Sequence, residues 1–226
     1  MPTILITGGG RGIGEELARQ AVTRGYEVFA TVRAAPAKAP AGVTLIAGVD
    51  LLRPQSVQNI VEALGGRPVD VLVNNAGIIG PSRQSTLDMD FDGFRATLEV
   101  NTLGPLRVAQ AVLANLRAAR DAAGVAKVLT ITSQMGRMSY SLSDRIAYRA
   151  SKSAVNKVMQ GLATDLKGER IAVQVIHPGW VRTDMGGRSA DVSPQDSAAG
   201  ILDRADALDM ATTGSFVDYS GQTMPW

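Results

Sequence analysis

Short apolar runs rich in β-branched residues alternate along this chain with longer segments of helical spacing. Runs that are apolar on both faces are typical of a parallel sheet, because helices on both sides of such a sheet bury both faces of each strand. We therefore predict an α/β fold with a doubly wound, seven-stranded parallel sheet. The predicted strands are Thr3–Thr7, Glu27–Val32, Val43–Ala47, Val69–Val73, Lys127–Thr132, Ile171–Ile176 and Ser215–Val217.

The segments between these strands carry Ala, Leu, Glu, Gln and Arg at helical spacing. Ser193 and Pro194 mark the start of the last helix, since serine is a preferred N-cap and proline suits the first helical turn. The predicted helices are Gly12–Arg24, Pro54–Leu64, Met89–Arg120, Asp144–Gly168 and Pro194–Asp203.

The chain is within reach of one α/β domain, with 226 residues of which 45% are hydrophobic. We expect a single domain over residues 1–226, with the Ala- and Pro-rich stretch 34–41 as a surface loop. The polar, glycine-bearing segment around 182–203 follows the sixth strand. Ligands of open α/β sheets bind beyond the carboxyl ends of the strands, so we expect this segment to border a substrate crevice.

Charge and composition exclude several classes of partner. The net charge is +2 with scattered basic residues, which disfavours nucleic acid and anionic membranes as partners. The absence of cysteine excludes disulfides and thiolate catalysis, and a single histidine disfavours a metal site. Met1–Thr7 leads directly into a glycine turn without signal-peptide character, and no run approaches the roughly 18 apolar residues of a membrane span. We expect a cytoplasmic protein.

A glycine-rich turn, Thr7-Gly8-Gly9-Gly10-Arg11-Gly12-Ile13-Gly14, follows the first predicted strand and precedes a helix. This order suits the pyrophosphate of a dinucleotide, since glycines let the backbone approach closely and a helix N-terminus offers free amides. The turn reads TGxxxGxG rather than GxGxxG. A purely conformational role is the alternative, and the position at the first strand–helix junction favours nucleotide binding.

The end of the second strand bears on the choice of cofactor. An acid there would hold the ribose hydroxyl of NAD, whereas an arginine would accept the 2′-phosphate of NADP. The chain reads Ala30-Thr31-Val32-Arg33, with no carboxylate. Arg33, with Arg11 as a second positive group, therefore predicts NADPH over NADH. The alternative is that both arginines are solvated surface residues.

Tyr148 and Lys152 lie four residues apart on a predicted helix, which places them on one face. An ammonium beside a phenol lowers the pKa of the phenol, so this spacing predicts an acid with a charged neighbour. Ser133 closes an apolar run fifteen residues earlier. Tyrosine and lysine at this spacing also recur by chance, so the pair alone does not identify a reaction.

Together these motifs closely resemble the classical short-chain dehydrogenase/reductase family, whose fold is the Rossmann fold. The resemblance covers nearly the whole chain. Its motifs are Thr7–Gly14, Asp50 after the third strand, Asn74-Asn75-Ala76-Gly77, Asn101, Ser133, Tyr148 with Lys152, and Pro178-Gly179 followed by Thr183. Within the family, the compact length, the string His177–Gly187 and the ending Gly221–Trp226 resemble the C-factor and sniffer-type carbonyl reductases.

The resemblance implies roles for the catalytic residues Asn101, Ser133, Tyr148 and Lys152. Tyr148 would protonate a carbonyl oxygen that Ser133 orients. Lys152 would contact the nicotinamide ribose and lower the pKa of Tyr148, and Asn101 would hold a water that links Lys152 to solvent. His177 would be structural.

The resemblance also implies which residues contact the cofactor and the substrate. The expected cofactor residues are Gly8, Gly10, Arg11, Gly12, Ile13, Gly14, Arg33, Asp50, Leu51, Asn75, Ala76, Gly77, Tyr148, Lys152, Pro178, Gly179, Val181 and Thr183. The expected substrate residues are Ile78, Ile79, Gln134, Met135, Met138, Tyr140, Trp180 and Met185.

The predicted function is an NADPH-dependent reduction of a small-molecule carbonyl, namely an aldehyde, ketone or quinone. Two alternatives stay open: an NAD(P)-binding signalling protein of C-factor type whose turnover is incidental, and an epimerase or dehydratase on the same fold. By resemblance we expect a homodimer or homotetramer, with the predicted helices 89–120 and 144–168 as candidate interfaces.

Overall fold

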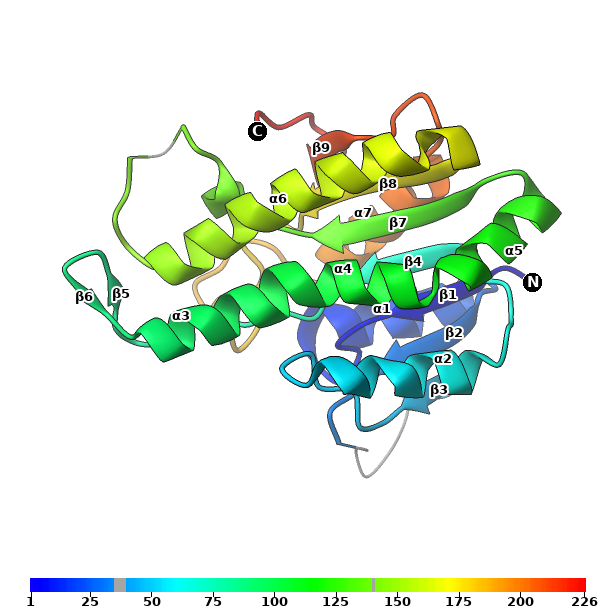
Figure 1. Cartoon of the computed structure of the whole chain (residues 1–226), viewed down its shortest axis with the longest axis horizontal. Coiled ribbons are helices and arrows are strands. Elements are labelled where there is room, and N and C mark those ends of the chain that lie inside the picture. Colours follow the sequence, from blue (N-terminus) through cyan, green and yellow to red (C-terminus); the bar gives the residue numbers. More distant parts are fainter. Residues whose placement is uncertain (35–39, 140) are drawn as a thin grey trace.

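The computed structural model describes residues 1–34, 40–139 and 141–226, and within them seven parallel strands form one sheet (Figure 1). The strand order is β3-β2-β1-β4-β7-β8-β9. This confirms the predicted α/β fold with its seven-stranded parallel sheet. The strands are β1 (Thr3–Ile6), β2 (Glu27–Thr31), β3 (Val43–Ile46), β4 (Val71–Asn74), β7 (Ala126–Ile131), β8 (Ile171–His177) and β9 (Ser215–Asp218).

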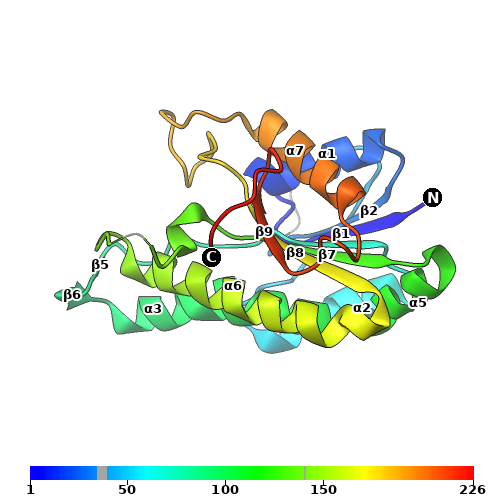
Figure 2. The ribbon, with the colours of Figure 1, turned by 90° about the horizontal axis from the view of Figure 1, so that it is seen from above.

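Helices cover both faces of the sheet (Figure 2). On one face lie α1 (Gly12–Thr23) and α7 (Pro194–Ala207). The residues of β1 alternate between the two layers: Ile4 and Ile6 belong to the apolar cluster that includes residues of α1 and α7, whereas Leu5 belongs to the cluster on the opposite face. The alternation follows from the two-residue period of a strand.

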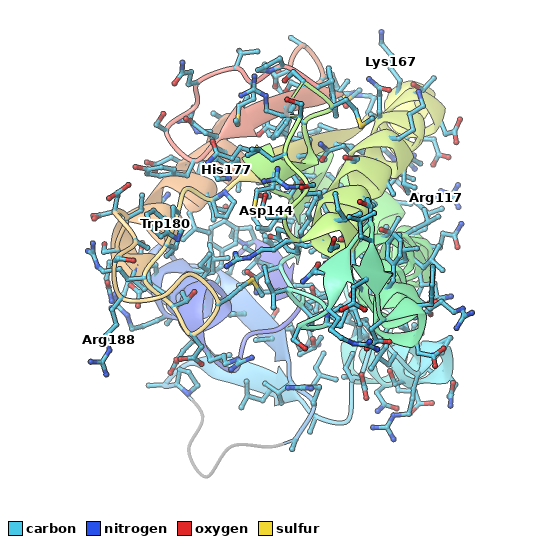
Figure 3. All side chains as sticks on the ribbon, turned by 90° about the vertical axis from the view of Figure 1, so that its left-hand side faces the viewer. Arg117, Asp144, Lys167, His177, Trp180 and Arg188 are labelled. Atoms are coloured by element: carbon cyan, nitrogen blue, oxygen red, sulfur yellow. The ribbon has the colours of Figure 1, made fainter. Side chains whose placement is uncertain are left out.

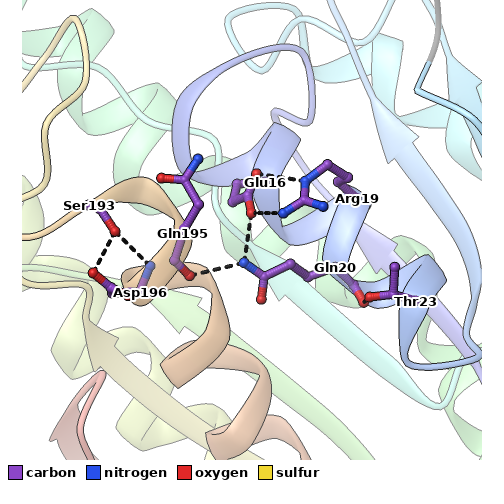
Figure 4. Close-up of polar contacts among 7 residues, drawn as sticks. All are labelled: Glu16, Arg19, Gln20, Thr23, Ser193, Gln195 and Asp196. Carbon is purple, nitrogen blue, oxygen red and sulfur yellow. Dashed lines mark hydrogen bonds and ion pairs between the residues drawn. The ribbon is translucent and has the colours of Figure 1, made fainter.

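Polar contacts join α1 to α7 (Figure 4). The Gln20 amide donates to the carbonyl of Gln195 at 3.0 Å and to the Glu16 carboxylate at 2.7 Å. At the start of α7, the Ser193 hydroxyl accepts from the Asp196 amide at 3.0 Å, and Pro194 occupies the first turn. The predicted N-cap of this helix is therefore confirmed.

The longest predicted helix, Met89–Arg120, is wrong as a single element. Met89 lies in a strand, and the remainder divides into successive segments. Pro105 supplies a physical reason for the first division, because proline lacks the N–H that would bond to the carbonyl of Asn101 four residues earlier. The segments are α3 (Phe91–Leu98), a π-helix (Glu99–Leu103), α4 (Gly104–Ala111) and α5 (Leu113–Ala123).

Helices α2 (Gln58–Leu64) and α6 (Ile146–Leu166), on the face opposite α1 and α7, follow the predictions closely (Figure 2). A 3₁₀ turn (Pro54–Val57) leads into α2, and α6 continues as another 3₁₀ turn (Lys167–Glu169). Helix α6 begins two residues later than predicted because Arg145 has a left-handed backbone, with φ 51° and ψ 45°. A left-handed residue cannot belong to a right-handed helix.

A short antiparallel hairpin of β5 (Gln84–Ser85) and β6 (Asp88–Met89) was not predicted. Two-residue strands are too short to leave a periodic pattern. The hairpin projects beyond the sheet beside the start of α3 (Figure 1). Among the described residues, we find no helix with the combined length and apolarity that a membrane crossing needs.

Candidate functional site

The strand order defines a topological switch point, because the chain leaves β1 toward β2 on one side while β4 lies on the other. The glycine turn follows β1, and Asn75, Ala76 and Gly77 follow β4. Figure 3 shows the molecule from the side toward which the strands point. Two segments 68 residues apart in sequence therefore meet where an open α/β sheet binds its ligand.

The glycine turn is packed too closely for side chains. A Cβ on Gly14 would lie 2.1 Å from the carbonyl oxygen of Gly8, and Gly8 and Gly12 have φ values of 71° and 57°. The side-chain amide of Asn75 donates to the carbonyls of Thr7 and Gly8. The main-chain N–H of Asn75 donates to the Thr7 hydroxyl at 3.0 Å. The turn is thus fixed against the residues that follow β4.

The start of α1 fits the pyrophosphate of a dinucleotide. Its N-cap residue is Arg11, whose side chain makes no capping hydrogen bond, so the first amides of the helix are not satisfied by that residue. Free amides and the helix dipole favour an anion at this point. The glycine cradle and the uncapped helix therefore fit the predicted cofactor.

The two arginines of the cofactor prediction differ in their surroundings. Arg33 lies two residues beyond β2, is exposed, and has no ion pair or hydrogen bond to the part of the chain that the structure describes. Arg11 forms an ion pair with Asp184, with 2.8 Å between Nη1 and Oδ2 and both side chains largely exposed. Arg33 is thus the unpaired cation at this edge, whereas Arg11 has a carboxylate partner.

Asp50 and Leu51 follow β3 along the same edge of the sheet. The Asp50 carboxylate accepts from the Leu52 amide at 3.1 Å, and the Asp50 main chain exchanges hydrogen bonds with the Ser56 hydroxyl. The Leu51 side chain is buried and packs closely against Gly104. A Cβ added to Gly104 would lie 2.9 Å from Leu51 Cδ1. Both residues are held in fixed positions at this edge of the sheet.

Helix α6 carries Tyr148 and Lys152 into the interior, where both side chains are buried. The Lys152 ammonium donates to the carbonyl of Ile131 at 2.8 Å and lies 5.7 Å from the centre of the Tyr148 ring. Ser133 follows β7 and caps a 3₁₀ turn, Gln134–Gly136, by accepting from the Met135 amide. The structure thus brings the predicted proton-transfer residues together.

Burial has the largest effect on the pKa values of Tyr148 and Lys152. Burial raises the pKa of Tyr148 to about 12, against smaller lowering effects of a Ser133 hydrogen bond and the Arg145 charge. Burial also lowers the pKa of Lys152 to about 8. The expected lowering of the Tyr148 pKa by Lys152 is not found, because the ammonium bonds to Ile131 rather than to the phenol. Tyr148 is therefore a protonated acid at neutral pH.

Asn101 lies in the π-helix and holds two segments together. Its Oδ1 accepts from the Ile78 amide at 2.9 Å, and its Nδ2 donates to the Ile78 carbonyl at 2.8 Å and to the Ser151 hydroxyl at 3.0 Å. Ser151 in turn donates to the carbonyl of Tyr148 at 2.7 Å. The carboxamide thus connects the segment after β4 to the first turns of α6.

The loop after β8 lies against the glycine turn. A Cβ on Gly12 would meet the Thr183 methyl group at 3.3 Å, and Val181 pairs with Val192 in an isolated bridge. Gly179 has a φ of 84°, which glycine adopts without strain. Pro178, Gly179, Val181 and Thr183 therefore belong to a loop that lies beside the glycine turn.

His177 ends β8 and is buried, and burial lowers its pKa to about 4. Its Nδ1 makes no hydrogen bond within residues 1–34, 40–139 and 141–226. The imidazole is neutral at pH 7. These surroundings agree with the packing role that the resemblance implies.

A pocket of about 560 Å³ opens next to the start of α6. Of the predicted substrate residues that the structure describes, Ile79 lines it, whereas Met138 is 82% exposed. Tyr140 lies outside the described residues. The sequence prediction missed the other lining residues because they belong to the short hairpin and an irregular loop. The pocket is lined by Ile79, Gly80, Pro81, Ser82, Gln84, Ser85, Ser143, Asp144 and Arg145.

A switch-point crevice with a glycine cradle, beside a buried tyrosine, serine and lysine, defines a nucleotide-dependent oxidoreductase of the Rossmann class. The family model for short chain dehydrogenases matches residues 2–193. The chain therefore belongs to the short-chain dehydrogenase family, and with it to oxidoreductases that use NAD(P).

Two curated proteins illustrate the relationship. The chain is 40% identical to C-signal of Myxococcus xanthus over 160 residues, which is 70% of this chain and 93% of that protein. It is 33% identical to the 1-hydroxy-2-glutathionyl-2-methyl-3-butene dehydrogenase of Rhodococcus sp. (strain AD45), over 100% of both chains.

Carbonyl reductases appear among similar solved structures. The carbonyl reductase Sniffer of D. melanogaster superposes with a TM-score of 0.91 at 29% identity, over 100% of both chains. An NADPH-bound carbonyl reductase from chicken fatty liver gives a TM-score of 0.87 at 25% identity, over 100% of this chain and 99% of that one. The resemblance to C-factor and sniffer-type proteins in the sequence analysis is thereby confirmed.

Proposed function

We propose that this protein is an NADPH-dependent reductase of aldehydes, ketones or quinones in which Tyr148 donates the proton. The observation that carries the proposal is the meeting of Asn101, Ser133, Tyr148 and Lys152 at the carboxyl edge of the sheet. The phenol is buried and protonated at neutral pH, the form that a proton donor needs.

The glycine turn and the first amides of α1 would hold the pyrophosphate, and Arg33 would contact the 2′-phosphate with Arg11 as a second cation. Asp50 and Leu51 would lie at the adenine. The segments 75–77 and 178–183 would line the nicotinamide side. When bound, the nicotinamide supplies the two electrons of the reduction as hydride.

The chain's own residues would orient the carbonyl oxygen and supply its proton. The Ser133 hydroxyl lies beside the phenol and would hold the oxygen in place. Tyr148 would donate its proton to that oxygen, and the Ser133 hydrogen bond and the Arg145 charge, which lower the pKa of the phenol, would favour the resulting phenolate. Asn101 would position α6 through Ser151 and, by family resemblance, a water that returns the proton.

Two further observations support NADPH as the cofactor. Arg33 is an exposed, unpaired arginine just beyond β2, where a 2′-phosphate would lie. The similar carbonyl reductase from chicken fatty liver was solved with NADPH bound.

The proposal is tested by NADPH oxidation over a panel of aldehydes, ketones and quinones, with NADH in parallel. Tyr148→Phe should lower kcat/KM by about 10³-fold, because general acid catalysis contributes 10²- to 10⁴-fold. NADPH affinity should change little. Tyr26→Phe is the matched control, since its phenol bonds to Asp206 outside the site. Full turnover by Tyr148→Phe would refute the assignment.

The likeness to C-signal favours one second candidate, a signalling protein whose NAD(P) occupancy controls a partner contact. That function requires a cofactor-dependent partner contact that persists in Tyr148→Phe. Conversion of a substrate without net NADPH consumption would instead favour an epimerase or dehydratase.

We also propose that the segment around 182–203 contributes to the substrate site and that the protein is a cytoplasmic homodimer or homotetramer. Sedimentation of the purified protein measures the oligomeric state.

A further inference from the structure

We propose that Arg145 binds a carboxylate of the substrate, so that the preferred substrates are oxo acids that carry the carboxylate a few bonds from the reacting carbonyl. The inference rests on the proposed reductase function and names the substrate class of that site. It arises from the pocket beside Tyr148 and from the charges that line it.

The pocket adjoins the predicted proton donor. Gln84 lines the pocket, and its Oε1 accepts from the Tyr148 amide N–H at 3.1 Å. Arg145, another lining residue, stands three residues before Tyr148, and its charge lowers the pKa of the phenol. Ile79, which also lines the pocket, follows the Ile78 that Asn101 binds. The pocket therefore adjoins the first turn of α6, which carries Tyr148.

One cation that lines the pocket, Arg145, makes no side-chain ion pair or hydrogen bond among the residues that the structure describes, although, after the hydrogen bond from Arg149, its charge helps to lower the pKa of the adjacent Asp144. Asp144 also lines the pocket, but its carboxylate is paired with Arg149 at 2.6 Å, and the Arg149 side chain is only 11% exposed. In the hairpin, Arg83 is likewise paired with Asp88 at 3.1 Å. The Arg145 side chain has no ion pair or hydrogen bond to the described part of the chain. Asp144 and Arg145 are the charged residues of the lining, and because Asp144 is bonded to Arg149, the Arg145 guanidinium is available to a ligand.

The other polar groups of the pocket match this chemistry. The Gln84 side chain already hydrogen-bonds within the protein, because its Nε2 donates to the carbonyls of Ile79 and Pro81. The hydroxyls of Ser82 and Ser143 line the pocket and have no hydrogen-bond partner in the described chain. A planar guanidinium with hydroxyl donors nearby suits a carboxylate, which accepts two parallel hydrogen bonds from arginine.

The backbone of Arg145 has a conformation that residues with a side chain rarely adopt. Its φ of 51° is unfavourable for a residue with a side chain, and only Arg170 shares this feature among the described non-glycine residues. Asparagine or glycine would satisfy the left-handed conformation at lower cost. A strained conformation that sets the entry to α6 and brings an unpaired cation into the pocket is typical of a ligand contact.

The test compares two substrates with the same carbonyl, 4-carboxybenzaldehyde and its methyl ester, using NADPH. The wild type should prefer the acid over the ester in kcat/KM by about tenfold, as expected for a charge-assisted hydrogen bond. Arg145→Asn suits the left-handed backbone and should bring this ratio to about one. Arg145→Lys should keep most of the preference because it keeps the charge. Direct binding of the product 4-(hydroxymethyl)benzoate, measured by calorimetry, should weaken in parallel.

Arg170→Asn is the matched control, because it removes an exposed left-handed arginine at the far end of the helical segment. It should leave the acid-to-ester ratio unchanged. A ratio near one in the wild type, or a ratio and product affinity unaltered in Arg145→Asn, would overturn the role of Arg145 while the reductase stands. Failure to reduce either aldehyde or any carbonyl of the panel would instead reject the proposed function.

Discussion

The ammonium of Lys152 donates to the main-chain carbonyl of Ile131 at 2.8 Å, so a charge on α6 is fixed to the last residue of β7 inside the protein. Burial of this charge lowers the pKa of Lys152 from 10.5 to about 8. The cation therefore costs stability in the folded state, and the fold tolerates it for the sake of the site.

Lys152→Met should abolish carbonyl reduction and raise the free energy of unfolding at pH 7 by about 1–2 kcal/mol, after allowance for the carbonyl that loses its donor. Between pH 8 and 10.5 the unfolded wild type binds more protons than the folded protein, so its stability rises with pH. The difference in unfolding free energy between Lys152→Met and the wild type, measured by urea unfolding, should therefore fall to zero between pH 8 and 10.5. A variant less stable than wild type at pH 7 would contradict the stated cost.

His177 should make the protein acid-sensitive. Burial lowers its pKa from 6.5 to about 4, so between these values the unfolded state binds more protons and stability falls as the pH falls. The loss should reach about 2 kcal/mol at pH 4.5 and should be absent in His177→Gln. Urea unfolding of both proteins at pH 7 and 4.5 measures the difference, and equal losses would exclude the imidazole as the cause.

Arg33→Ser should reduce the preference for NADPH over NADH by about tenfold, because the substitution removes a charge-assisted contact to the 2′-phosphate. NADH has no such phosphate, so its affinity serves as the internal control. Fluorescence titration of both dinucleotides measures the change. An unaltered preference would make Arg33 an ordinary surface residue.

Asp184→Asn should strengthen NADPH binding about two- to threefold, since it frees Arg11 from its exposed ion pair. Stability should hardly change, because exposed pairs contribute about 0.2–1 kcal/mol. The effect should require Arg11, so the double variant with Arg11→Ser should bind NADPH no better than Arg11→Ser alone. Weaker binding by Asp184→Asn would show that the ion pair supports the crevice.

Gly136→Ala should lower the free energy of unfolding by about 1–3 kcal/mol and kcat by more than tenfold. The new Cβ would lie 2.8 Å from the main-chain carbon of Lys152, so the turn that Ser133 caps would have to move. Gly161→Ala on α6, the helix that carries Lys152, is the control. Its new Cβ would meet nothing within 4 Å, so the substitution should stabilise α6 by about 0.5–1 kcal/mol. Equal behaviour of the two variants would contradict the close packing.

The strands were predicted within two residues because the central strands are buried on both faces, and burial leaves a continuous apolar run. The π-helix at Asn101 escaped prediction although Pro105 marks it, because good helix formers such as Leu98, Leu106 and Arg107 lie on both sides of it. The pocket beside the start of α6 was missed because its hairpin has two-residue strands. The Arg11–Asp184 pair joins residues 173 apart, and no local pattern encodes such a contact.

Gln84 joins the wall of the pocket to the helix that carries Tyr148. Its one carboxamide holds the carbonyls of Ile79 and Pro81 and the amide N–H of Tyr148. Because this brace is internal, residues at the rim such as Ser82 and Ser143 are free to vary without displacing the phenol. Divergence of substrate choice among related proteins would therefore be expected at the rim, with the brace retained.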